Sequence, residues 1–286
     1  MQLPIPVNVG VLALQGGFLE HMLLLRRAAA HIVNSPSSPL AGDRQDLINL
    51  IEVRNPQDLA KCHGLIIPGG ESTTIALIAA QSGLLEPLRE FVKTAQKPTW
   101  GTCAGLILLS EEANAAKKGG QELIGGLDVR VHRNHFGRQI ESFVADVELP
   151  FLAQSQALAS SSSSSASGAL STVSGTLDST AHFPGVFIRA PVVEKLLLAP
   201  AATDREGKVL GKAKKDVEIL GVLPNRTGRV QGGPLQQHIS ELQGGEEVND
   251  IVAVRQGNVL GTSFHPELTD DIRIHVWWLE QVLKTV

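Results

Sequence analysis

A five-residue stretch, Gly101-Thr102-Cys103-Ala104-Gly105, constrains this chain more than any other. An extended approach leads into it and an apolar helical stretch follows, which is the layout of a nucleophile elbow with cysteine at its centre. A turn this sharp strains the backbone of its middle residue, and the small neighbours leave room for it. Cys103 would then lie at the start of a helix, where backbone N–H groups favour a thiolate. The alternative is a buried structural cysteine beside a tight turn.

The chain has a formal net charge of −4 over 286 residues. A protein that binds nucleic acid through its phosphates carries a basic surplus, so this charge argues against a nucleic-acid partner. No run of about 18 apolar residues is present to span a bilayer, and the first residues lack the features of a signal peptide. Cys62 and Cys103 show neither metal-site nor redox-motif spacing, which is typical of a reducing compartment. We therefore expect a cytoplasmic protein without a membrane partner.

Short apolar runs alternate with helical periodicity in the first part of the chain. Runs that are apolar at nearly every position are typical of strands buried on both faces of a sheet. The pattern predicts strands at 7–14, 47–53 and 64–68, and helices at 18–30, 56–61, 69–82 and 86–94. This alternation indicates an α/β fold with a mostly parallel, doubly wound central sheet and helices on both faces.

The alternation of strands and helices ends after the predicted helix that follows Cys103, and predicted strands predominate from there. We interpret 126–132 and 139–148 as an antiparallel pair, a small extension of the sheet. Further strands are predicted at 185–190, 193–198 and 217–223, with a hairpin formed by 251–255 and 259–263. The final helix is predicted to be capped by Thr269, with Asp270 and Asp271 in its first turn.

Three segments interrupt this pattern, near 34–46, 153–181 and 225–249. The first is rich in turn residues, the second contains an unbroken serine run at 160–165, and the third is rich in glycine and glutamine. The serine-rich composition is typical of a disordered surface loop, to which we assign no catalytic role. We expect residues 7–286 to form a single domain that carries these three insertions, rather than two domains.

A cysteine nucleophile needs a base within hydrogen-bond reach, and the base needs a third group that orients it. His265 and Glu267 follow a predicted strand and stand two residues apart, with Pro266 between them. In extended geometry such positions point to the same side, so Glu267 can hold one imidazole nitrogen while the other faces Cys103. A His-Pro turn with a solvated glutamate is the alternative for these residues alone.

The tetrahedral intermediate of such a nucleophile also needs backbone N–H donors for its oxyanion. Ala104, the residue after the nucleophile, can supply one, and Gly70, on the glycine loop after a neighbouring strand, can supply another. A phosphate cradle is the alternative for this loop. It is weakened by the absence of a Walker lysine and by Glu71, which would lie at the anion site.

Together these motifs resemble the class I (triad) glutamine amidotransferases. The resemblance is carried by Pro68-Gly69-Gly70-Glu71-Ser72-Thr73-Thr74, by the cysteine elbow and by Ser263-Phe264-His265-Pro266-Glu267-Leu268. More narrowly, the chain is similar to the glutaminase subunits of pyridoxal 5′-phosphate synthase, the Pdx2/PdxT/SNO family. That match rests on Leu14-Gln15-Gly16 with Glu20-His21, on Arg133-Asn134-His135-Phe136-Gly137-Arg138-Gln139 and on Gly185-Val186-Phe187-Ile188-Arg189-Ala190-Pro191. Insertions of this length are more typical of a eukaryotic member.

The resemblance implies a three-layer, flavodoxin-like fold that hydrolyses L-glutamine to L-glutamate and ammonia without a cofactor. Cys103 would attack the side-chain amide, His265 would move protons, and Glu267 would orient His265. By motif position, the residues that line the glutamine site would be Gly70, Glu71, Ser72, Arg133, Ile188 and Arg189.

The resemblance also implies a partner. This would be a separate (β/α)₈-barrel pyridoxal 5′-phosphate synthase subunit of vitamin B6 biosynthesis, which receives the ammonia within a hetero-oligomer. Its docking would involve the region of Gln15 and Glu20-His21. A peptide at Gly69-Gly70 could turn away from the substrate until that docking selects the productive orientation.

Other interpretations stay open. Arg133 and Arg189 suit the α-carboxylate of glutamine, although most arginines instead form ion pairs on the protein surface. The chain could be a triad glutaminase that serves a different synthase, or a catalytically silent regulatory subunit. His132 and His135 form a His-x-x-His pattern, but no carboxylate or cysteine pattern completes it in the sequence, so we expect no metal site.

Overall fold

The computed structural model describes residues 6–35, 47–114, 121–133, 135–136, 142–153, 181–197, 216–224 and 249–286. The predicted insertions near 34–46, 153–181 and 225–249 lie outside these residues, apart from their first or last positions. Within the described ranges, no helix is both long and apolar enough to cross a membrane.

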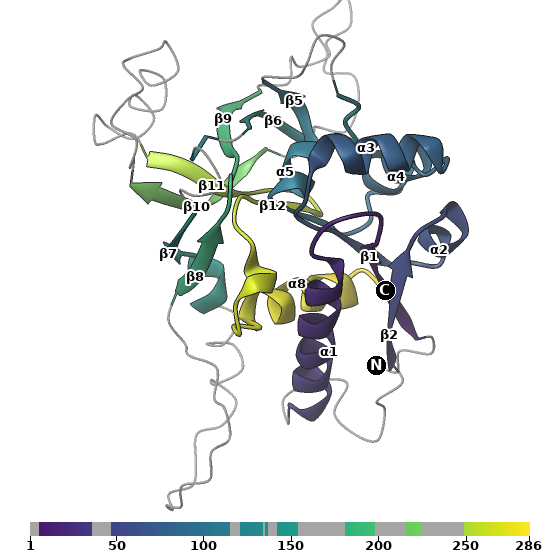
Figure 1. Ribbon diagram of the computed structural model, residues 1–286. Coiled ribbons are helices and arrows are strands. Elements are labelled where there is room, and N and C mark those ends of the chain that lie inside the picture. Colours follow the sequence, from purple (N-terminus) through teal and green to yellow (C-terminus); the bar gives the residue numbers. More distant parts are fainter. Residues whose placement is uncertain are drawn as a thin grey trace, which may run out of the picture.

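In the described part of the chain, ten strands form one large sheet (Figure 1). Nine of them follow the order β2-β1-β3-β4-β12-β11-β9-β6-β5, and β10 pairs with β11 outside this path. The pairs along β2-β1-β3-β4-β12 and the pair β5-β6 are parallel, whereas β11 and β9 pair antiparallel with their neighbours. The strands are β1 (Val7–Leu12), β2 (Ile48–Val53), β3 (Gly64–Ile67), β4 (Thr99–Thr102), β5 (Ser110–Ala113), β6 (Leu127–His132), β9 (Val192–Leu196), β10 (Glu218–Pro224), β11 (Asn249–Gln256) and β12 (Val259–Thr262).

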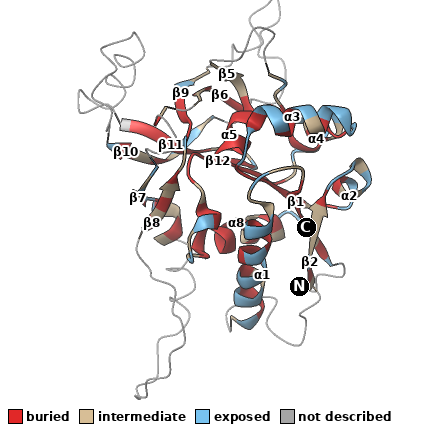
Figure 2. Ribbon diagram, viewed as in Figure 1, coloured by how far each residue is buried: buried red, intermediate tan, exposed pale blue. Residues whose placement is uncertain are grey.

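Helices cover both faces of this sheet, each over its own hydrophobic cluster (Figures 1 and 2). One layer consists of α1 (Phe18–Asn34) and α8 (Arg273–Leu283), which contact each other. The other contains α2 (Pro56–Ala60), α3 (Ser72–Gln81), α4 (Leu85–Arg89) and α5 (Ala104–Leu109), and a π-helical turn at Glu90–Thr94 continues α4. The predicted three-layer α/β fold with a mostly parallel central sheet is confirmed.

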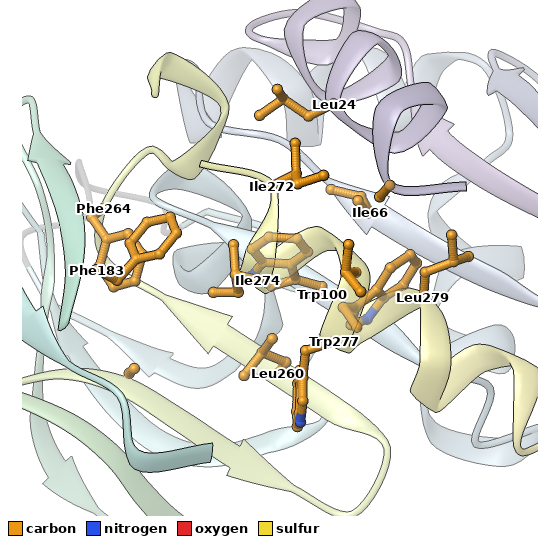
Figure 3. Packing of buried hydrophobic residues seen from close by; sticks show 14 of the residues in the cluster. Leu24, Ile66, Trp100, Phe183, Leu260, Phe264, Ile272, Ile274, Trp277 and Leu279 are labelled. Carbon is orange, nitrogen blue, oxygen red and sulfur yellow. The ribbon is translucent and has the colours of Figure 1, made fainter. Parts of the chain in front are cut away.

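The core beneath α1 and α8 contains Trp100, a fully buried residue of β4. Figure 3 shows its indole among aliphatic side chains from two other parts of the chain: Ile66 on β3, and Ile272 and Ile274 at the start of α8. This packing holds the end of β4, and with it the cysteine elbow, against the C-terminal helix.

The predicted pairing of 126–132 with 139–148 is wrong, although both segments form strands. β6 lies in the main sheet between β5 and β9, while β7 (Phe143–Glu148) pairs with β8 (His182–Phe187) in a separate two-stranded antiparallel sheet. The reason is burial. Four of the six β6 residues are buried, whereas β7 has one buried residue and alternates between half-buried and exposed positions. β7 instead stacks Phe143 on Phe187 of β8, with ring centroids 4.8 Å apart. Adjacency in sequence favours a hairpin, but burial decides the partner.

The predicted cap of the final helix is also wrong. Pro266–Leu268 forms a short 3₁₀ turn (η4), and the hydroxyl of Thr269 closes it by donating to the carbonyl of Pro266 at 2.9 Å. The helix α8 begins only at Arg273, whose backbone N–H donates to the Asp271 carboxylate at 2.9 Å. The preceding hairpin of β11 and β12 matches its prediction.

Candidate active site

Cys103 occupies the turn between β4 and α5 with a positive φ of 47°, the strained geometry expected at the centre of an elbow. Its backbone N–H donates to the carbonyl of Thr262 at 2.8 Å, which ties the elbow to the end of β12. The flanking glycines are required by close approach. A Cβ on Gly105 would overlap the backbone carbonyl of Ile67, and one on Gly101 would overlap that of Gly105.

His265 and Glu267 lie beside this elbow. His265 Nδ1 lies 2.8 Å from Glu267 Oε1, and its backbone N–H donates to the carbonyl of Val186 at 2.8 Å. Two glycines form the wall around the pair. A side chain on Gly69 would strike the imidazole ring, and a Cβ on Gly17 would lie 2.8 Å from Glu267 Oε1. The imidazole is therefore held on one side by the carboxylate and is left facing Cys103 through its other nitrogen.

The electrostatics favour a charged His265–Glu267 pair. Burial by itself would lower the pKa of His265, but hydrogen bonds with Cys103 and Glu267 raise it to about 10. Burial by itself would raise the pKa of Glu267. The imidazoles of His21 and His265, which lie against its two oxygens, instead hold that pKa well below its usual range. The site can therefore keep a proton on His265 beside the cysteine sulfur, as a thiolate–imidazolium pair requires.

The glycine loop after β3 is held in place by the loop after β1. The carbonyl of Gly69 accepts a hydrogen bond from the backbone N–H of Gly17 at 3.1 Å, and the backbone N–H of Glu71 donates to Gln15 Oε1 at 2.8 Å. Ala104 is the first residue of α5, so the helix's own ladder leaves its N–H unused. Gly70 and Ala104 thus stand on the two loops expected to supply oxyanion donors.

Three of the predicted glutamine-binding residues come together at the start of α3. Arg133 Nη2 donates to the hydroxyls of Ser72 at 3.0 Å and Thr73 at 3.3 Å, and lies 3.6 Å from Glu71 Oε1. Glu71 caps this helix by accepting from the backbone N–H groups of Thr73 and Thr74. Burial opposes the charge of Glu71, but these hydrogen bonds lower its pKa.

Ile188 and Arg189 follow β8 on the other side of the elbow. The Ile188 carbonyl lies 3.9 Å from Cys103 Sγ. Arg189 is exposed and has a positive φ of 46°, a conformation that a bulky residue rarely adopts. Its guanidinium makes no ion pair with the residues described here. Strained backbone of this kind is concentrated at functional sites, which fits a role in substrate binding.

The structure changes the interpretation of two histidines. His21, predicted near a docking surface, is fully buried and lies 3.3 Å from Glu267 Oε2, so only its neighbour Glu20 is exposed. His135 is adjacent to a carboxylate that sequence reasoning missed, because its Nε2 lies 3.0 Å from Asp250 Oδ1. No group of three or more potential metal ligands occurs within the described ranges. The remaining residues of the Arg133–Gln139 motif lie outside them, except Phe136.

Cys62, the second cysteine, lies apart from the elbow. It is fully buried and its thiol donates to the carbonyl of Asp58 at 3.3 Å. Burial raises the pKa of this thiol to about 11, which keeps it protonated and unreactive near neutral pH.

Comparison with known proteins identifies the family of this chain. The model of the SNO glutamine amidotransferase family matches residues 11–160 and 229–284. The chain belongs to the SNO glutamine amidotransferase family. The matched segments carry Cys103, His265 and Glu267, together with the glycine loop at Gly69-Gly70.

Relatives of this SNO-family chain carry consistent names. It is 41% identical over 274 residues to the probable pyridoxal 5′-phosphate synthase subunit PDX2 of Arabidopsis thaliana, covering 96% of this chain and 85% of that one. It is 36% identical to the pyridoxal 5′-phosphate synthase subunit SNO1 of Saccharomyces cerevisiae, covering 96% and 93%. A solved glutamine amidotransferase structure matches with a TM-score of 0.59 and 33% identity, over 96% of this chain and 98% of that one.

Proposed function

We propose that this chain hydrolyses L-glutamine to L-glutamate and ammonia by nucleophilic catalysis at Cys103, as a subunit of a pyridoxal 5′-phosphate synthase. The observation that carries the proposal is the juxtaposition of an elbow cysteine, an imidazole and a buried carboxylate. Family membership supports the reaction, since the family is one of glutamine amidotransferases. The names of the relatives support the synthase, because each is a subunit of that enzyme.

The chemistry follows from the geometry. The Cys103 thiolate attacks the side-chain amide carbon, and the carbonyl oxygen becomes an oxyanion that the N–H groups of Gly70 and Ala104 stabilise. His265 gives its proton to the amide nitrogen, the C–N bond breaks, and ammonia leaves behind a glutamyl thioester. Water then attacks the thioester carbon while His265 accepts its proton, which returns the free sulfur and releases glutamate.

Substrate binding is assigned to the start of α3 and the loop after β8. Arg133 and Arg189 suit the α-carboxylate of glutamine, because a guanidinium binds a carboxylate through paired N–H donors. Glu71, Ser72 and Ile188 complete the site in this proposal. Glu71 carries a negative charge favoured by its cap hydrogen bonds, which matches the α-ammonium group of the substrate.

The ammonia passes to a separate synthase subunit in this proposal, with a (β/α)₈ barrel as the expected partner. The described residues of the main sheet and its covering helices form one glutaminase-like fold. The Gly69 carbonyl, held by Gly17, and the Glu71 N–H, held by Gln15, set the peptide orientation in the glycine loop. Partner docking near Gln15 and Glu20 can reset this orientation and so couple hydrolysis to demand.

The decisive assay measures glutamate release at saturating glutamine, with the chain alone and with an excess of a synthase subunit of the type that accompanies the yeast and plant relatives. We expect slow release alone and a clear stimulation by the synthase. Equal rates in both conditions would refute the coupling but keep the glutaminase. No release in either condition would support a silent regulatory subunit, and stimulation only by an unrelated synthase would assign another pathway.

A further inference from the structure

A second histidine, His21 on the first turn of α1, lies behind Glu267 and takes no part in the mechanism above. It is fully buried, and its Nε2 lies 3.3 Å from Glu267 Oε2 and 3.2 Å from Thr102 Oγ1. His265 occupies the other carboxylate oxygen, Oε1, at 2.8 Å. The carboxylate of Glu267 is thus held between two imidazole rings, of which one faces Cys103 and the other faces the protein interior.

The chain of contacts continues from His21 to α8. His21 Nδ1 lies 3.0 Å from His275 Nε2, and His275 is also fully buried. Trp100 contacts both rings edge to face, with centroid separations of 5.6 Å to His21 and 5.0 Å to His275. The indole of Trp100, labelled in Figure 3, therefore packs the histidine pair between α1, β4 and α8.

The direction of proton donation between His275 and His21 follows from the one ring nitrogen of the pair that has no hydrogen-bond partner. His275 Nδ1 is buried and makes no hydrogen bond. A proton there would leave a buried N–H unpaired, which is unfavourable, so the proton of His275 belongs on Nε2 and is donated to His21 Nδ1. His21 then carries its own proton on Nε2, which faces the carboxylate of Glu267. Burial and the neighbouring His21 hold the pKa of His275 well below its usual range, which fits an uncharged donor.

We propose that His21, supported by His275, is a positioning residue of the catalytic site that fixes Glu267 so that its Oε1 stays aligned with His265. This inference rests on the proposed glutaminase function. The contact of His21 Nε2 with the far oxygen Oε2 adds a second polar constraint on the orientation of the carboxylate. Two buried histidines contribute less packing stability than apolar side chains of similar size, so their presence here fits a role in alignment.

The first test compares two substitutions at one position, with the synthase subunit present. His21→Leu keeps the volume and removes the donor, whereas His21→Gln can place an amide N–H where Nε2–H stands. We expect His21→Leu to lower kcat by roughly 10- to 100-fold, the scale on which outer hydrogen-bond partners act, with KM little changed. His21→Gln should recover most of the lost kcat. The control is His31→Leu, at an exposed position of the same helix, with unchanged kcat and KM.

A second test separates alignment of Glu267 from general destabilisation. If His21 acts through Glu267, His21→Leu should cost little in a Glu267→Gln background, whereas independent effects would multiply. Multiplied losses, or an unaffected kcat in His21→Leu, would overturn the inference. Thermal unfolding of each variant checks that it is folded. Should His21→Leu fail to fold, His275→Leu replaces it in the same comparison with and without Glu267→Gln. This substitution removes the hydrogen bond from His275 to His21 while leaving His21 in place.

The outcomes for the two proposals are distinguishable. An unaltered chain that releases no glutamate with its synthase would overturn the proposed function, and this inference with it. An active chain whose kcat is insensitive to His21 and His275 would overturn the inference alone. A change confined to KM would also do so, because neither histidine contacts the expected glutamine site.

Discussion

At the scale of single residues, the site depends on the contacts that link Cys103, His265 and Glu267. Cys103, His265 and Glu267 are each mostly buried, so water does not compete for their hydrogen bonds. The carboxylate is the most buried member, with 1% of its side chain exposed, and it stays ionised because the His265 and His21 imidazoles lie 2.8 and 3.3 Å from its two oxygens. Removing any one member therefore has a predictable consequence.

The triad substitutions should rank by role. Cys103→Ala and His265→Asn should lower kcat by about 10⁶-fold, because they remove the nucleophile and the proton carrier. Glu267→Gln should cost less, about 10⁴-fold, because orientation is lost but proton transfer is retained. Glutamate release with the synthase present gives the rates, and thermal unfolding checks the fold. Substantial activity in Cys103→Ala would remove this cysteine from the mechanism.

The pH dependence of kcat/KM should report His265. Its pKa is raised to about 10, so the imidazolium beside Cys103 persists below that pH and is lost as the pH rises through it. We expect the alkaline limb near pH 10, measured on samples shown to be folded by circular dichroism. Cys103, Glu267 and, behind Glu267, His21 are the groups that face His265. Glu267→Gln removes an anion that raises the pKa of His265, so the alkaline limb of this variant's kcat/KM profile should move to lower pH. An unmoved alkaline limb would contradict the assignment to His265.

At the scale of elements, the site is assembled by strand register. β4 and β12 are parallel neighbours with Thr102 opposite Thr262, so both strands end at the same edge of the sheet. Cys103 directly follows the first strand, and His265 follows the second by three residues. Parallel pairing thereby brings together residues that are far apart in sequence, as expected at the carboxyl ends of strands in a doubly wound sheet.

Gly69→Ala tests whether the glycine loop sets the position of the imidazole. The added methyl would strike the His265 ring, so we expect the ring to shift and kcat to fall by about 100-fold. Gly64→Ala is the matched control, because its Cβ would lie 2.7 Å from Val282 in the core, away from the site. That variant should lose about 1–3 kcal/mol of unfolding free energy and keep its kcat. Equal kcat losses in both variants would indicate that destabilisation alone lowers activity.

At the scale of the whole molecule, α1 lies beside the candidate active site and presents part of its surface to solvent. Leu19 and Leu23 stand one turn apart on α1 and are each more than half exposed, at 54% and 57%. Their helix also carries His21 on its buried side. A partner docked on α1 would therefore cover apolar surface close to the glycine loop and the triad.

Channelling predicts the source of the nitrogen in the synthase product. With amide-¹⁵N glutamine and an excess of unlabelled ammonium in the buffer, we expect the product to carry mostly ¹⁵N, because in the proposed function ammonia passes between subunits without entering bulk water. Mass spectrometry of the product gives the ratio. Synthase supplied with ammonium alone is the control for direct use of free ammonia. A product whose label matches the bulk mixture would show that ammonia is released before it is used.

The sequence by itself determined the local chemistry and the fold class. The elbow around Cys103 can be read from the sequence because only small residues permit so sharp a turn. The pairing of His265 with Glu267 was predicted from extended geometry, but that reason is wrong: a 3₁₀ turn at Pro266–Leu268 brings the two side chains together. The tertiary structure decided what depends on distant neighbours. The burial of four of its six residues favours the place of β6 in the main sheet, and the 3₁₀ turn at Pro266–Leu268 delays the start of α8. The contact of His21 with Glu267 exists only because α1 and η4 pack together, and no local pattern encodes which of two adjacent helical residues faces the buried carboxylate of Glu267.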